Sequence, residues 1–164
     1  RINESRKRRY RIMKLSKNLS LSECLVSNTA KRLGISNEPT KEHLRNLESI
    51  AINIFQPLRE GLSVPIYVSS GYRSKELNKA IKGSSKTSQH MKGQALDLDA
   101  DVYGRVTNAE IFKFIRDNLD FDQLIWEYGT DDNPSWVHVS FVEGKNRGRV
   151  LTCYGKSQYK IYGS

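Results

Sequence analysis

Residues 88–99 read SQHMKGQALDLD, a polar loop that leads into an alternating segment. The last five letters alternate between apolar and acidic side chains, as the residues of a half-buried β-strand do. Leu96 and Leu98 are therefore expected to face a core, and Asp97 and Asp99 to share the opposite face. Taken alone, that second face is equally typical of a solvated sheet surface.

Working outward from this strand, the sequence predicts four more strands and four helical regions. The strand-like runs are 65–70, 122–128, 136–142 and 149–154, and the last three predict an antiparallel meander because short linkers join them. The helical regions begin at Ser20, Lys41, Lys75 and Thr107. Helices first and strands later predict an α+β domain with a central, mostly antiparallel sheet and flanking helices.

Local signals set the expected ends of these helices. Ser20 and Thr107 each start a capping box, and Thr40 is a suitable N-cap for the longest helix. This helix is predicted from residue 41 to about residue 59, with Pro57 expected to kink it or end it early.

The charge of the chain is unevenly distributed. The 164 residues carry a formal charge of +9, but residues 1–17 hold eight Lys or Arg against Glu4. The remaining residues hold 19 basic and 17 acidic groups, so the body is close to neutral. A basic leader, 1–17, which need not be ordered, is thus distinguished from a domain over 18–164. The near-neutral body argues against a nucleic-acid partner, and no apolar run is long enough to predict a transmembrane segment.

Two of the three histidines lie in settings that suit a metal ligand. His90 is seven residues before Asp97, and Gly93 between them allows the chain to double back. His138 lies in the middle of the apolar strand at 136–142. For each side chain alone, a satisfied polar group is the simpler interpretation. Together, two imidazoles and a carboxylate are sufficient protein ligands for a catalytic zinc ion, although other borderline divalent ions also suit this set. His43 has no such setting and is expected at the surface.

These motifs resemble a known family of enzymes. The pattern SxHxxGxAxD at 88–97, with SGYRS at 70–74 before it and WVHVS at 136–140 after it, is similar to the M15 zinc peptidases. The resemblance covers most of residues 15–154. These peptidases are D-Ala-D-Ala carboxypeptidases and related peptidoglycan endopeptidases, including phage endolysins. The resemblance implies the α+β fold shared by DD-peptidases and hedgehog proteins. It also implies one Zn²⁺ per chain, held by His90, Asp97 and His138.

The resemblance also directs the search for catalytic residues. Several family members carry a glutamate three residues before the last histidine ligand, but this chain has Ser135 there. Glu127, at the end of a strand expected to fold back beside His138, is the predicted general base. The resemblance places Arg73 near a substrate carboxylate, which a guanidinium binds bidentately. Ser88 is expected to steady the site by a hydrogen bond to a ligand residue.

The function implied is zinc-dependent hydrolysis of peptide bonds in peptidoglycan stem peptides, at the bacterial cell wall or in the periplasm. The basic leader is expected either to contact an anionic wall polymer or a larger phage or envelope assembly, or to be a solvated tail. The alternative is a binding module that holds zinc without turnover, as hedgehog signalling proteins use this fold. Cys24 and Cys153 lie far apart in sequence, and the sequence leaves their pairing open.

Overall fold

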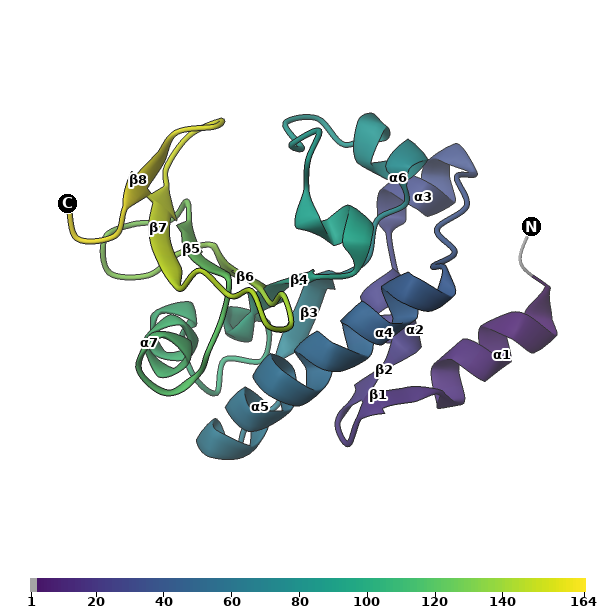
Figure 1. Cartoon of the computed structure of the whole chain (residues 1–164), viewed down its shortest axis with the longest axis horizontal. Coiled ribbons are helices and arrows are strands. Elements are labelled where there is room, and N and C mark those ends of the chain that lie inside the picture. The colour runs from purple at the N-terminus through teal and green to yellow at the C-terminus, as the bar shows by residue number, and fades with distance from the viewer. Residues whose placement is uncertain (1–2) are drawn as a thin grey trace.

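A six-stranded mixed sheet forms the centre of the computed structural model, which describes residues 3–164 (Figure 1). The strands run in the order β3-β4-β6-β5-β7-β8. Their bounds are β3 (Tyr67–Ser70), β4 (Ala95–Asp99), β5 (Gln123–Glu127), β6 (Trp136–Ser140), β7 (Arg149–Cys153) and β8 (Tyr159–Ile161). All neighbours are antiparallel except β5 and β7, which are parallel. The predicted α+β class is therefore confirmed.

The predicted meander of the last three strands is wrong. The chain forms a β5–β6 hairpin, but β7 then pairs with the free edge of β5 rather than with β6. The far edge of β6 is already occupied by β4. Residues 141–148 instead pass around the start of β5, where the Gly148 and Arg149 amides donate to the carbonyls of Phe121 and Asp122. This route brings β7 in parallel to β5.

Helices cover one face of the sheet, whereas the helical segments within residues 75–92 lie on the side of the opposite face (Figure 1). The α-helices are α1 (Glu4–Ile12), α2 (Leu21–Leu25), α3 (Asn28–Leu33), α4 (Lys41–Ile50), α5 (Gln56–Leu62), α6 (Lys75–Ala80) and α7 (Asn108–Asn118). The other helical turns are η1 (Ala51–Phe55), η2 (Gln89–Lys92) and η3 (Ala100–Val102), and β1 (Lys14–Ser16) pairs with β2 (Leu19–Ser20). Among residues 3–164, no helix has the length and apolar content needed to cross a bilayer.

The long predicted helix continues past Pro57. It runs as α4, a π-helical η1 and α5, and it ends at Leu62 because Ser63 takes up a left-handed conformation. A proline ring clashes with the carbonyl four residues earlier in a regular α-helix. The wider π turn directly before Pro57 accommodates the ring, so the proline changes the helical register instead of ending the helix.

The predicted caps are confirmed at three helix starts. Ser20 and Thr107 form capping boxes before α2 and α7, and the Thr40 hydroxyl accepts from the His43 amide at the start of α4. The helix starting at Ser20 is nevertheless interrupted. It ends at Leu25, and a second helix, α3, follows and ends in a left-handed Gly34.

The core lies between the sheet and the segment α4–η1–α5, together with α7. The sheet contributes alternate residues of its central strands, among them Leu96, Leu98, Leu124, Trp126, Val137 and Val139. The helices contribute Leu47, Ile50, Ile54, Leu58, Ile111 and Phe112. Both sets are almost completely removed from water, so this face fixes the positions of β4, β5 and β6.

The basic leader forms the helix α1 and the strand β1 where it is described, and its first two residues lie outside the described part. α1 buries none of its residues, but Arg6 forms an ion pair with Glu38, and Leu15 of β1 belongs to the core. The boundary at residue 17 stays a prediction. Cys24 and Cys153 are both buried and free.

Candidate metal centre

The three predicted ligands converge on one point of the sheet. Asp97 of β4 lies directly opposite His138 of β6 in the strand register, and His90 approaches from η2. One ligand atom from each residue lies within 4.8 Å of the other two. Asp97 Oδ1 is 3.3 Å from His90 Nε2 and 3.1 Å from His138 Nδ1, and the imidazole centroids are 5.2 Å apart. These three side chains form a compact group that can hold one metal ion.

Backbone geometry around η2 fixes the position of His90. The Ser88 hydroxyl accepts from the His90 amide at 3.3 Å, and its role in steadying the site stays a prediction. Gly93 ends the turn at φ +71°, and a Cβ there would lie 2.6 Å from the His43 carbonyl oxygen. A side chain at Gly93 would therefore be both strained and obstructed, so glycine is required where the chain turns back into β4.

A hydrogen bond to the backbone sets the tautomer of His90. Its Nδ1 lies 2.6 Å from the carbonyl oxygen of Gly71, which can only accept, so Nδ1 carries the proton. The lone pair of Nε2 then points towards Asp97. Metal-binding histidines commonly use their second nitrogen in this way.

The protonation states suit a metal ion. Burial lowers the pKa of His90 and favours its neutral form. Burial also tends to raise the pKa of Asp97, but the adjacent imidazoles of His90 and His138 outweigh that effect and hold the pKa well below its ordinary value. A neutral imidazole and an ionised carboxylate are the forms that bind metals. Two nitrogens and one oxygen fit zinc or another borderline divalent ion.

Arg73 lies beside these ligands. Its amide donates to the His90 carbonyl at 3.1 Å, and its Nε donates to the Ser70 hydroxyl at 3.2 Å. Its Nη2 is 3.5 Å from Asp97 Oδ2. The guanidinium is thus held at the edge of the metal group while it also lines the neighbouring cleft. Its role with substrate stays a prediction.

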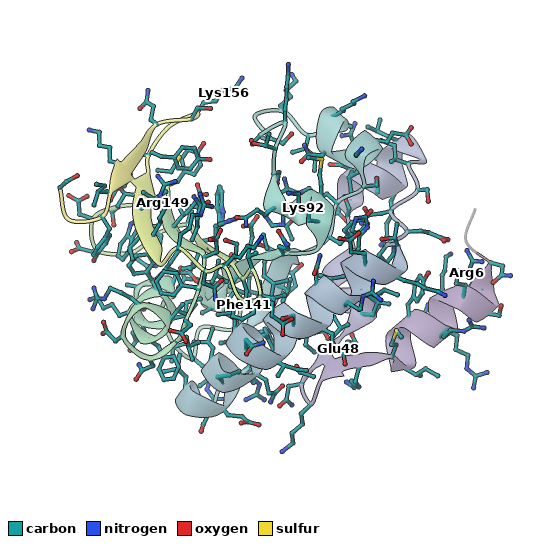
Figure 2. The ribbon with its side chains drawn as sticks, in the orientation of Figure 1. Arg6, Glu48, Lys92, Phe141, Arg149 and Lys156 are labelled. Carbon is teal, nitrogen blue, oxygen red and sulfur yellow. The ribbon has the colours of Figure 1, made fainter. Side chains whose placement is uncertain are left out.

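A cleft of about 770 Å³ lies over the metal group. Residues 81–92 form one wall, and the β7–β8 hairpin forms the other, on opposite sides in Figure 2. Its volume is in the range of ordinary ligand sites. Three cross-strand rows run along the floor and continue into the β7–β8 wall. They are Gln123 and Arg149; then Asp97, His138, Ile125 and Leu151; then Trp136, Glu127, Cys153 and Tyr159.

Glu127, the predicted general base, faces this cleft. It pairs with Trp136, which places it diagonal to His138, a separation that long side chains can span. Burial raises its pKa to about 7; Asp97 adds to this, whereas His138 and Cys153 act in the opposite direction. Ser135 is exposed and is not part of the cleft lining. Among the described residues, Glu127 is the one cleft-lining carboxyl besides Asp97.

The third histidine is outside the metal group. His43 Nδ1 accepts from the Thr40 amide at the start of α4, and the ring lies against Tyr72 with centroids 4.8 Å apart. It was expected at the surface, and it is partly buried by this contact. Arg149 and Cys153 of β7 line the cleft. The sequence does not predict them there, because it does not predict the parallel pairing of β7 with β5.

Comparison with known proteins gives one family. The family model described as Peptidase M15 matches residues 17–140, which is well over half of the chain and includes the three candidate ligands, Arg73 and Glu127. No curated protein matches the chain.

Proposed function

The chain belongs to the Peptidase M15 family and is a peptidase by that membership, and we propose that it uses zinc to hydrolyse peptide bonds in peptidoglycan stem peptides. The convergence of His90, Asp97 and His138 at the floor of an open cleft supports this proposal most strongly. Three protein ligands leave a coordination position open, as catalytic zinc sites require.

A zinc ion held by these ligands would polarise the scissile carbonyl and acidify a water molecule. The protein supplies the shape of the site and its protonation states. His90 is fixed through Gly71 and Ser88, and Asp97 is fixed by its register opposite His138. Because the core face of β4 and β6 is packed, these donors are preorganised before substrate binds.

Glu127 is proposed to move the proton. Its carboxylate accepts a proton from the attacking water and donates it to the departing amine, so that the peptide bond breaks and no charge accumulates on nitrogen. The position is suitable because Glu127 lies one row from His138 and is shielded from bulk water.

Arg73 is proposed to orient the substrate through a carboxylate. Its side chain is mostly buried and already held by Ser70, so little conformational freedom is lost when a carboxylate binds. A carboxylate at the end of the peptide would give carboxypeptidase action, and one within a branched stem would give endopeptidase action.

A digest of purified peptidoglycan tests the proposal. The zinc-loaded protein should release stem fragments that mass spectrometry identifies, and a chelator should stop the release. His90→Ala should abolish it, whereas the matched variant His43→Ala should remain active, because His43 lies outside the metal group. Equal release by the His90 and His43 variants would overturn the assignment of the metal site.

A second candidate is a module that binds zinc and cell wall without turnover. It is favoured by Ser135, which stands where several family members carry a glutamate. Under this alternative, zinc analysis gives about one ion per chain, and the digest releases nothing. Under the first proposal, both measurements are positive.

The proposed place of action is the bacterial cell wall or periplasm, with the basic leader as a contact for an anionic wall polymer or a larger phage or envelope assembly. The leader carries most of the net charge, and electrostatic contacts of exposed residues weaken with salt. Removing residues 1–17 should reduce salt-sensitive binding to cell walls, with turnover of a small soluble peptide as the control.

A further inference from the structure

Basic side chains outnumber acidic ones in the cleft lining, whereas the domain as a whole is close to charge balance. Residues 18–164 hold 19 basic and 17 acidic side chains, which is close to balance. The cleft lining has six basic side chains, Arg73, Lys82, Lys92, Arg147, Arg149 and Lys156. Its acidic side chains are Asp97 and Glu127, and both lie at or beside the metal group. Away from that group, the charged side chains of the lining are all basic.

Four of these six basic residues make no ion pair within the part of the chain that the structure describes. Arg147 is bound to Asp122, and Arg73 lies against Asp97. The remaining four are Lys82 and Lys92 on one wall and Arg149 and Lys156 on the other. Figure 2 shows Lys92 and Arg149 on opposite sides of the cleft and Lys156 at the tip of the β7–β8 hairpin.

This arrangement differs from a row of solvated lysines on a convex surface. A cleft bordered by low-dielectric protein focuses the electric field and raises the local concentration of oppositely charged ligands. The floor between Arg149 and the metal group includes the buried apolar side chains Ile125 and Leu151. A bound divalent ion would add further positive charge.

We propose that the cleft selects acidic peptides: the substrate carries a carboxylate beyond the one facing Arg73, and Lys92 and Arg149 bind it from opposite walls. This inference rests on the proposed peptidase function and specifies its substrate class. Lys82 and Lys156, which also line the cleft, attract the same ligand at longer range. The extra carboxylate gives binding energy away from the scissile bond and fixes the direction of the peptide in the cleft.

Two stem peptides that differ by one group test this inference. One keeps its glutamyl α-carboxylate, and in the other this carboxylate is amidated. Fluorescence anisotropy gives the Kd of each labelled peptide for the chelator-treated full chain, and steady-state kinetics gives kcat/KM for the zinc-loaded chain. We expect the acidic peptide to bind about tenfold more tightly at low salt. The difference should shrink near 1 M salt, where the Debye length is about 3 Å.

Matched double variants locate the effect. Lys92→Gln with Arg149→Gln should remove the preference for the acidic peptide. Lys31→Gln with Arg32→Gln removes the same formal charge from exposed positions in the last turn of α3, outside the cleft, and should keep the preference. If the preference persists without Lys92 and Arg149, the assignment to these residues is wrong.

The remaining outcomes separate this inference from the proposed function. Equal affinities for the two peptides in wild-type protein would overturn the inference. Tighter binding of the acidic peptide without cleavage of either would support the cleft assignment while removing the peptidase proposal. A short RNA of equal charge that displaces the acidic peptide at equal concentration would show a general polyanion surface and overturn the specificity for peptides.

Discussion

The two faces of the central sheet are built from alternate residues of the same strands, yet they bury very different side chains. On the helix-facing side, β4 and β6 contribute Leu96, Leu98, Val137 and Val139 to the core. On the cleft side, the same two strands contribute Asp97 and His138. Because successive side chains of a β-strand point to opposite faces, one residue of these strands packs in the core and the next lies in the metal group.

This difference shows how a polar cluster can be held in place at low conformational cost. Asp97 and His138 lie directly opposite each other because their apolar neighbours fix the register, and a slip of one residue would exchange the two faces. A substitution on one face should therefore change catalysis, and a substitution on the other should change folding. The following predictions test that separation.

The largest effect is expected from His138→Ala on the cleft face. Loss of one of three ligands should lower zinc occupancy and reduce peptidase activity by about 1,000-fold or more, equivalent to about 4 kcal/mol of transition-state stabilisation. Zinc analysis and kcat/KM on a stem peptide measure the two effects. A variant that keeps both zinc and activity would exclude His138 from the metal group.

The next largest effect on activity is expected from Glu127→Gln. The amide cannot accept a proton, so kcat should fall by about 100- to 10,000-fold, while zinc content stays at the wild-type level. Ser135→Ala is the matched control, and less than a twofold change is expected because Ser135 lies outside the cleft lining. A larger loss in the Ser135 variant than in the Glu127 variant would reverse the assignment.

The cleft face was predictable from sequence where the signal was local. Alternation in 95–99 predicts which face Asp97 occupies, and the turn at Gly93 predicts that His90 can reach it. The capping residues Ser20, Thr40 and Thr107 are equally local, since each acts on the next three residues. These features depend on backbone geometry over a few positions, so the sequence determines them directly.

The opposite wall was not predictable in this way. β7 could pair with β6 in a meander or with β5 in parallel, and its own sequence does not distinguish these partners. The choice depends on the occupied edge of β6 and on the path of residues 141–148 around Asp122. Because this pairing was missed, the presence of Arg149 and Cys153 in the cleft was missed with it.

Leu98→Ala tests the core face directly. Leu98 is completely buried, and truncation should reduce the free energy of unfolding by about 2–5 kcal/mol through lost burial and a residual cavity. Urea denaturation measures this loss, and kcat per folded molecule should stay within about twofold of wild type. Ile52→Ala, an apolar truncation at an exposed position, should change stability by less than about 0.5 kcal/mol. A large loss of kcat in the folded Leu98 variant would show that the two faces are not separable.

The smallest expected effect concerns Asp122, which joins the two walls of the cleft at their base. It is buried and accepts from Gln89 of one wall and from the Arg147 guanidinium and amide near the other. Hydrogen bonds from Arg147 lower the pKa of Asp122 to about 2, below the ordinary value of 3.8. Since the folded-state pKa is the lower one, the stabilisation is complete above about pH 5 and is lost progressively as the pH falls towards about 1.

Asp122→Asn should therefore cost about 2 kcal/mol at neutral pH, and the difference from wild type should shrink as the pH falls below about 4 and vanish near pH 1 in urea titrations. Asp120→Asn, at an exposed position, should show no such pH-dependent difference. A constant cost of Asp122→Asn across this pH range would mean that Asp122 acts through packing alone and not through its charge.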